Sequence, residues 1–151
     1  MSERVRKVQK KDASSWATMG VALEEAGRHE EALDAFDKAI EIDARDVHVH
    51  YNKGIALSNL GRYVEALDAY NRAIEIVPQS INAWCNKGFA LERLGRHEEA
   101  VEAYDQAIEF DGQDASVWYN KGVALGNLGR LDEALESYDQ AIKIAPQSAQ
   151  F

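Results

Sequence analysis

Apolar residues recur along this sequence with helical spacing, in blocks of equal length. From Ala13 onward the pattern returns every 34 residues without a gap. In the first half of each block, positions 1, 4, 8 and 11 are mostly apolar or small, and they lie within about 80° of arc on a helix. A second apolar stripe follows, as in Leu33, Phe36 and Ile40. Each block therefore predicts two helices. The four blocks, called repeats one to four, are 13–46, 47–80, 81–114 and 115–148.

Two glycines occupy the same places in every repeat and limit where the helices run. The first, Gly20 in repeat one, stands in mid-helix, where glycine costs about 1 kcal/mol relative to alanine. A neighbour must therefore pack too closely for a side chain, and we expect that neighbour to be the second helix, whose Ala32 is also small. The second glycine, Gly27, falls just past the first helix, where a left-handed residue closes the last turn. Pro78 and Pro146 mark where second helices stop.

These residues resemble the tetratricopeptide repeat pattern, which reads Trp-x2-Leu-Gly-x2-Tyr, then Ala-x3-Phe, then Pro over 34 residues. The sequence departs from it at His50, where the family has Trp, and at Lys53, Lys87 and Lys121, where the family prefers Leu. We expect these lysine stems to pack while the ammonium groups reach water. The resemblance implies an all-α, right-handed superhelical solenoid of four antiparallel helix pairs. The matching residues include Trp16, Gly20, Ala32 and Phe36, then Trp84, Gly88, Ala100 and Tyr104, then Trp118, Gly122, Ala134, Tyr138 and Pro146.

Two short segments fall outside the repeats. Residues 1–12 are rich in Lys and Arg, and we interpret them as a basic N-terminal arm or a lead-in to the first helix. An anion-binding arm is the less favoured alternative, because no aromatic residues are interleaved with the basic ones. Residues 149–151 are interpreted as a tail without a capping helix.

A candidate binding groove is predicted on the face of the first helices opposite the buried one. Amides there can pair with a peptide backbone while apolar groups receive its side chains, and the resemblance implies the same use of asparagine as a ladder. Packing between neighbouring first helices is the alternative reading, and we favour it for Val21, Ile55 and Val123. The candidate groove residues are Asn52, Asn86, Asn120, Tyr51, Tyr119, Phe89, Cys85, His48 and Asn82.

One binding mode known in the family is not expected. Members that hold chaperone C-termini use a two-carboxylate clamp of lysines, an arginine and asparagines. Counted from repeat one, those places hold Ala17, Val21, Asn52, Asn82 and Asn86, of which only Asn52 fits. Without cations a bound carboxylate would be desolvated and unpaired. We therefore predict no chaperone C-terminal carboxylate clamp.

The last second helix carries an apolar edge that no further repeat of this sequence covers. Its candidate residues for self-association are Leu135, Tyr138, Ile142 and Phe151. The sequence thus leaves three functions open. The first is an interaction scaffold that binds an extended, largely uncharged peptide segment in the groove. The others are a structural segment that self-associates weakly through this end, and a fragment of a longer array that regulates another protein.

Composition and charge limit the kinds of partner that the protein can bind and the cellular compartment in which it is expected. With 46% hydrophobic and 28% charged residues the sequence is typical of soluble globular proteins. No apolar run is long enough to span a membrane, and the charged first twelve residues do not fit a signal peptide. A net charge of −9 argues against binding nucleic acid. The single cysteine fits a reducing compartment, so we predict a cytoplasmic protein.

No pattern indicates an enzyme. The pairs His48/His50 and His29/His97 fall at places where other repeats carry different residues, which argues against a metal site. Cys85 has no His or Asp partner fixed by the repeat pattern, so a wall residue of the groove is the better account. We therefore predict no catalytic residues, no metal and no cofactor.

Overall fold

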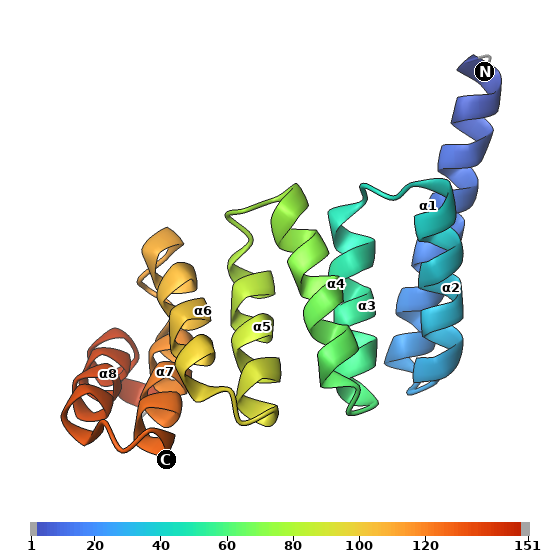
Figure 1. The fold of residues 1–151 in the computed structure, drawn as a ribbon. Helices are drawn as coiled ribbons and strands as arrows, with labels where there is room; N and C mark the ends of the chain where they lie inside the picture. The colour runs from blue at the N-terminus through green and yellow to red at the C-terminus, as the bar shows by residue number, and fades with distance from the viewer. Residues whose placement is uncertain (1–2, 149–151) are drawn as a thin grey trace. The chain divides into compact units, whose positions relative to one another are not determined.

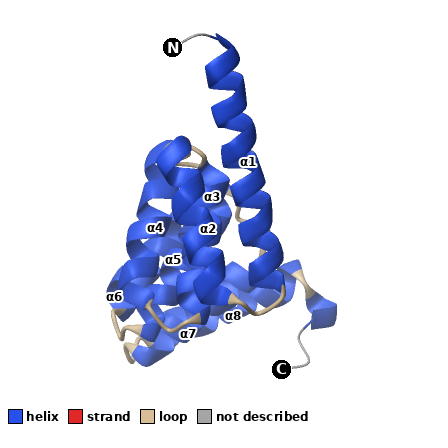
Figure 2. Cartoon of the chain, turned by 90° about the vertical axis from the view of Figure 1, so that its right-hand side faces the viewer, coloured by secondary structure: helices blue, strands red, loops and turns tan. Residues whose placement is uncertain are grey.

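The computed structural model describes residues 3–148, and every regular element in this range is a helix (Figure 1; Figure 2). The all-α arrangement of helix pairs predicted by the repeat pattern is confirmed. Phe151 and residues 149–150 lie outside the described range. No helix within 3–148 combines the length and the apolar character needed to cross a membrane. The helices are α1 (Glu3–Glu25), α2 (His29–Ile42), α3 (Val47–Asn59), α4 (Tyr63–Ile76), α5 (Ile81–Arg93), α6 (His97–Phe110), α7 (Ala115–Asn127) and α8 (Leu131–Ile144), followed by the 3-10 helix η1 (Pro146–Ser148).

The helices form two compact bodies, α1 to α4 and α5 to α8. In the first body α1 packs on α2 and α3 on α4, and α2 also contacts α3. The second body repeats this plan, with α5 on α6, α7 on α8, and α6 against α7. Each body therefore contains two helix pairs and one joint between consecutive repeats. Residues 3–12 are the first turns of α1, which extends past α2 (Figure 1).

The loops between paired helices close as the sequence predicts. Gly27 has φ +75°, and the same left-handed conformation recurs at the equivalent glycine of every repeat. The Arg28 N–H donates to the Leu23 carbonyl over 2.8 Å, and the Gly27 N–H donates to the Glu24 carbonyl over 3.0 Å. These bonds satisfy carbonyls that the helix end would otherwise leave without partners. The first helices of repeats two to four are capped at the other end, as where the Asp46 carboxylate accepts the His48 N–H over 3.0 Å at the start of α3.

The mid-helix glycine faces the second helix, as the sequence predicts, and the nearest atoms belong to an aromatic ring of that helix. A Cβ at Gly20 would lie 2.6 Å from Cδ1 of Phe36, and one at Gly122 would lie 2.6 Å from Cε1 of Tyr138. The aromatic ring occupies the space that a side chain at the glycine would need, so the ring of the second helix packs closely against the backbone of the first. Ala32 is fully buried, and its small size serves the same close approach of the helices.

His50 replaces the tryptophan of the other repeats without losing its hydrogen bond. Its Nε2 lies 2.8 Å from the carbonyl oxygen of Ala44, and the Trp118 Nε1–H donates to the Gly112 carbonyl over 2.9 Å. Both carbonyls belong to the turn six residues earlier in the chain. The ring N–H therefore fixes the start of the first helix against the preceding turn, and histidine provides it as tryptophan does.

We expect His50→Phe to lower the free energy of unfolding by about 1 kcal/mol, because the part-buried hydrogen bond to the Ala44 carbonyl would be lost. His50→Trp retains a ring N–H and should cost much less. Urea denaturation of both variants measures the difference. An equal loss in the two variants would contradict the role assigned to the hydrogen bond.

Candidate functional site

In the first body, the predicted groove residues lie on α3, which contacts α1. Tyr51 and Asn52 are half-buried, and His48 is exposed at the start of the helix. The Tyr51 ring lies 6.2 Å from the ring of Tyr70, centroid to centroid, with the planes tilted by 51°. The ring of Tyr51 thus packs against α4, the second helix of the same repeat. On α1 the equivalent residue is Ala17, so this body offers one groove tyrosine.

In the second body, the predicted groove residues lie on α5 and α7, which also contact each other. Phe89 on α5 is 47% exposed and Tyr119 on α7 is 37% exposed. Tyr119 stacks against Tyr138 at 5.6 Å and 48°. The remaining groove residues of this body are Asn86 and Asn120, both half-buried, Cys85, also half-buried, and Asn82, exposed.

The Cys85 thiol is unsuited to nucleophilic chemistry. Burial raises its pKa to about 11, and the negative charge of Asp114 adds to the effect. At neutral pH the group is therefore a protonated thiol, whereas the thiolate is the reactive form. Cys85 contributes a small, weakly polar wall to this face.

Ion pairs neutralise much of the acid on the second helices. In every repeat an arginine donates two hydrogen bonds to the glutamate three residues later, as between Arg62 and Glu65 over 2.8 and 2.7 Å. The hydrogen bond from the guanidinium lowers the pKa of Glu65. These glutamates are exposed, so the pairs contribute little to stability. The equivalent pairs are Arg28–Glu31, Arg96–Glu99 and Arg130–Glu133.

The lysines that replace the family's leucine make contacts that the sequence did not reveal. All three lysines are half-buried, and two of their ammonium groups reach a carboxylate of the preceding repeat. Lys53 Nζ lies 2.7 Å from Oδ1 of Asp37, and Lys121 Nζ lies 2.6 Å from Oδ1 of Asp105. These pairs cross the joints α2–α3 and α6–α7, so they help to fix one repeat on the next.

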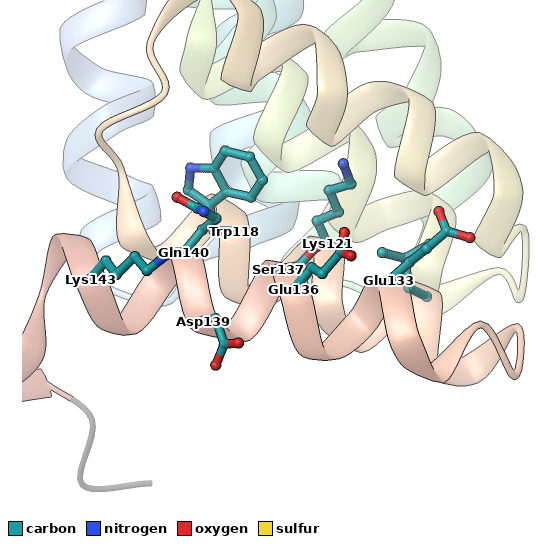
Figure 3. Close-up of a pocket in the computed structure, with 9 residues that line it drawn as sticks. Trp118, Lys121, Glu133, Glu136, Ser137, Asp139, Gln140 and Lys143 are labelled. Carbon is teal, nitrogen blue, oxygen red and sulfur yellow. The ribbon is translucent and has the colours of Figure 1, made fainter.

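An open cavity of about 430 Å³ between α7 and α8 was also not predicted (Figure 3). Trp118 and Lys121 contribute to it from α7, and α8 supplies Glu133, Glu136 and Gln140. The Lys121 ammonium lies 5.4 Å from the centre of the Trp118 ring. Similar hollows recur at equivalent residues of repeats two and three. The lysine that recurs in the sequence lines each of these cavities. Its positive charge is balanced by nearby carboxylates.

The predicted self-association edge lies on the outer face of α8. Leu135 and Ile142 are exposed, whereas Tyr138 is partly covered by its contacts with Gly122 and Tyr119. Leu131, which the sequence did not single out, is exposed beside them. This face therefore combines three exposed aliphatic side chains.

Among the described side chains, residues 12–147, no group of three or more His, Cys, Asp or Glu residues is placed to hold a metal ion. His29 and His97 each pair with a glutamate instead, over 2.9 Å to Glu24 and 2.6 Å to Glu92.

Comparison with known proteins identifies the family and the fold. A family model described as "Tetratricopeptide repeat" matches residues 3–47, 17–81 and 83–149. A search of curated protein sequences gives no match.

Solved structures of MamA resemble the fold. A crystal structure of MamA is 22% identical, with a TM-score of 0.88 over 99% of this chain and 87% of that chain. A structure of MamA residues 41 to the end from Desulfovibrio magneticus RS-1 is 24% identical, with a TM-score of 0.84 over 89% of this chain and 76% of that one. At these identities the likeness concerns the fold alone.

Proposed function

The chain belongs to the tetratricopeptide repeat family, a protein-interaction fold, and we propose that it binds an extended, largely uncharged peptide segment along its first helices. Asn52, Asn86 and Asn120 would hold the backbone of the peptide. Tyr51, Phe89 and Tyr119 would contact its side chains. Aromatic residues suit such a site because they bury large areas at a low cost in side-chain entropy.

The observation that carries this proposal is the face shared by α5 and α7. Phe89 and Tyr119 expose 47% and 37% of their surface there, although both helices bury other apolar residues completely. Because Tyr119 is held by Tyr138, its ring is pre-positioned for a partner. Asn86 and Asn120 are half-buried on the same two helices. A face that carries both exposed aromatic rings and amides matches the chemistry of an extended peptide.

Packing between first helices is the competing explanation for the apolar residues. It fits Ile55 and Val123, which are half-buried, better than Phe89 or Val21, which are exposed. The proposal therefore rests on Phe89, Tyr119 and the asparagines, and leaves Ile55 and Val123 to packing.

We expect the triple variant Asn52→Ala, Asn86→Ala, Asn120→Ala to weaken peptide binding by about two orders of magnitude, since each lost hydrogen bond is worth about 1 kcal/mol. Peptides selected from a displayed random library against the wild-type chain provide the ligand. Fluorescence anisotropy measures the affinity, and circular dichroism verifies that the variant keeps its helices.

A matched control removes three amides from other faces, as Gln106→Ala, Gln113→Ala and Gln140→Ala. It should bind the selected peptides as the wild type does. Unchanged affinity of the asparagine variant would contradict the ladder. A selection that yields no binder above background would contradict peptide binding in the groove altogether.

Self-association through α8 is a second candidate function, favoured by the exposed Leu131, Leu135 and Ile142. Exposed aliphatic residues that adjoin on one helix are typical of interaction surfaces. The expected signature is a molecular mass that rises with protein concentration.

A further inference from the structure

The outer face of α8 repeats a surface that the same chain covers elsewhere. Leu33 on α2 and Val101 on α6 are each 6% exposed, because α3 and α7 pack against those helices. Leu135, at the same position of repeat four, is 61% exposed. We call Leu135 with Ile142 the α8 face. It corresponds to the surface that α2 and α6 contribute to the joints α2–α3 and α6–α7.

The other surface of such a joint is exposed on α1. The covering helices α3 and α7 place an alanine, Ala56 or Ala124, in the joint, and both alanines are 0% exposed. Ala22 is the same residue at the same position of α1, and it is exposed. Met19, one turn earlier, is exposed as well. We call Met19 with Ala22 the α1 face.

Charged residues at the two faces also follow the joint. Arg62 Nη1 lies 3.4 Å from Oε2 of Glu30, and the equivalent Arg130–Glu98 pair spans 3.3 Å. These pairs cross the joints α2–α3 and α6–α7. Beside the α1 face, Arg28 occupies the position of Arg62 and Arg130. Asp132, at the start of α8, occupies the position of Glu30 and Glu98, so the two residues have opposite charges. The lysine of the closed joints is replaced by Met19, so one ion pair is missing and the contact should be weaker.

From this match we infer that the α8 face of one copy binds the α1 face of a second copy, in the register of the joints inside each body. The inference rests on self-association through α8, the second proposed function, and names its partner surface. Because the two surfaces differ, the contact is heterologous. Each copy keeps one unused face, so assembly continues with concentration and does not stop at a dimer.

Two variants of the full chain test the inference by sedimentation velocity over a concentration series. Leu135→Glu blocks the α8 face, and Ala22→Glu blocks the α1 face. Both positions are exposed, so the fold should tolerate the change, which circular dichroism verifies. Val64→Glu is the matched control, since Val64 is equally accessible on α4.

The wild type and Val64→Glu should associate, and each face variant should associate about tenfold more weakly. An equimolar mixture of Leu135→Glu and Ala22→Glu should form a 1:1 complex that does not grow, because each variant retains one intact and complementary face. If Ala22→Glu associates as the wild type does while Leu135→Glu does not, α8 pairs with itself; the second function then stands and the head-to-tail register is overturned. If the wild type stays monomeric at the highest concentration, both are overturned.

Discussion

Replacing Phe36 with alanine is expected to lower the free energy of unfolding by about 3–5 kcal/mol, the usual cost of removing a buried aromatic ring. Phe36 is fully buried, and its ring lies against the backbone of α1 at Gly20. Gly20 has no side chain that could turn into the space left by the ring. The cavity should therefore persist, and urea denaturation would show the loss.

Leu131→Ala is the control for that variant. Leu131 is a large apolar residue of a second helix like Phe36, but it is 64% exposed. Its truncation should change the free energy of unfolding by no more than about 0.5 kcal/mol. Similar losses in the two variants would show that the Phe36 ring is not a principal contact between α1 and α2.

The repetition made most of the fold predictable. Glycine recurs at the position of Gly27 in all four repeats, which identifies a turn. The turn and the end of the second helices then follow from backbone rules alone. The two-helix repeat follows from the period of the apolar positions. The same rules do not give the orientation of one ring relative to one backbone. For this reason the sequence predicted that the second helix approaches Gly20 closely, but not that the ring of Phe36 makes the nearest contact.

Contacts between repeats were harder to predict, because they join positions that are distant in sequence. Lys53 departs from the family pattern, but nothing local indicates that it pairs with Asp37 sixteen residues earlier. His50 is similar, since its role depends on the Ala44 carbonyl of the preceding turn. To predict such pairs one needs the packing angle between helices, and the periodicity of a single helix does not provide it.

For the candidate groove, helical spacing predicted which residues share a face but not how much of each is accessible. Phe89 and Val123 occupy equivalent positions, yet only Phe89 is exposed. The support of Tyr119 by Tyr138 likewise depends on the neighbouring helix. Accessibility is therefore what the structure adds, and it is the quantity on which the proposed binding depends.

Gly54→Val is expected to lower the free energy of unfolding by about 3 kcal/mol, through overpacking rather than through a cavity. A Cβ at Gly54 would lie 2.7 Å from Cδ1 of Tyr70. The Tyr70 ring is 1% exposed, and its hydroxyl lies 3.1 Å from Oγ of Ser58. The ring is therefore fixed at both its face and its hydroxyl, and α3 must move away from α4 to admit the valine.

The same substitution at Gly126 separates packing from helix propensity. Gly126 lies in α7, and a Cβ there would meet nothing within 4 Å. Valine is a somewhat better helix former than glycine, so Gly126→Val should leave the stability unchanged or raise it slightly.

A double-mutant cycle then assigns the cost of Gly54→Val to the Tyr70 ring. Tyr70→Leu alone is destabilising, but this variant lacks the planar ring with which a valine at position 54 would clash. Adding Gly54→Val to Tyr70→Leu should therefore cost about 1–2 kcal/mol less than adding it to the wild type. Strict additivity would contradict the glycine-to-ring contact as the reason for glycine in mid-helix. A positive coupling would establish it as the constraint that sets how closely the paired helices of each repeat approach.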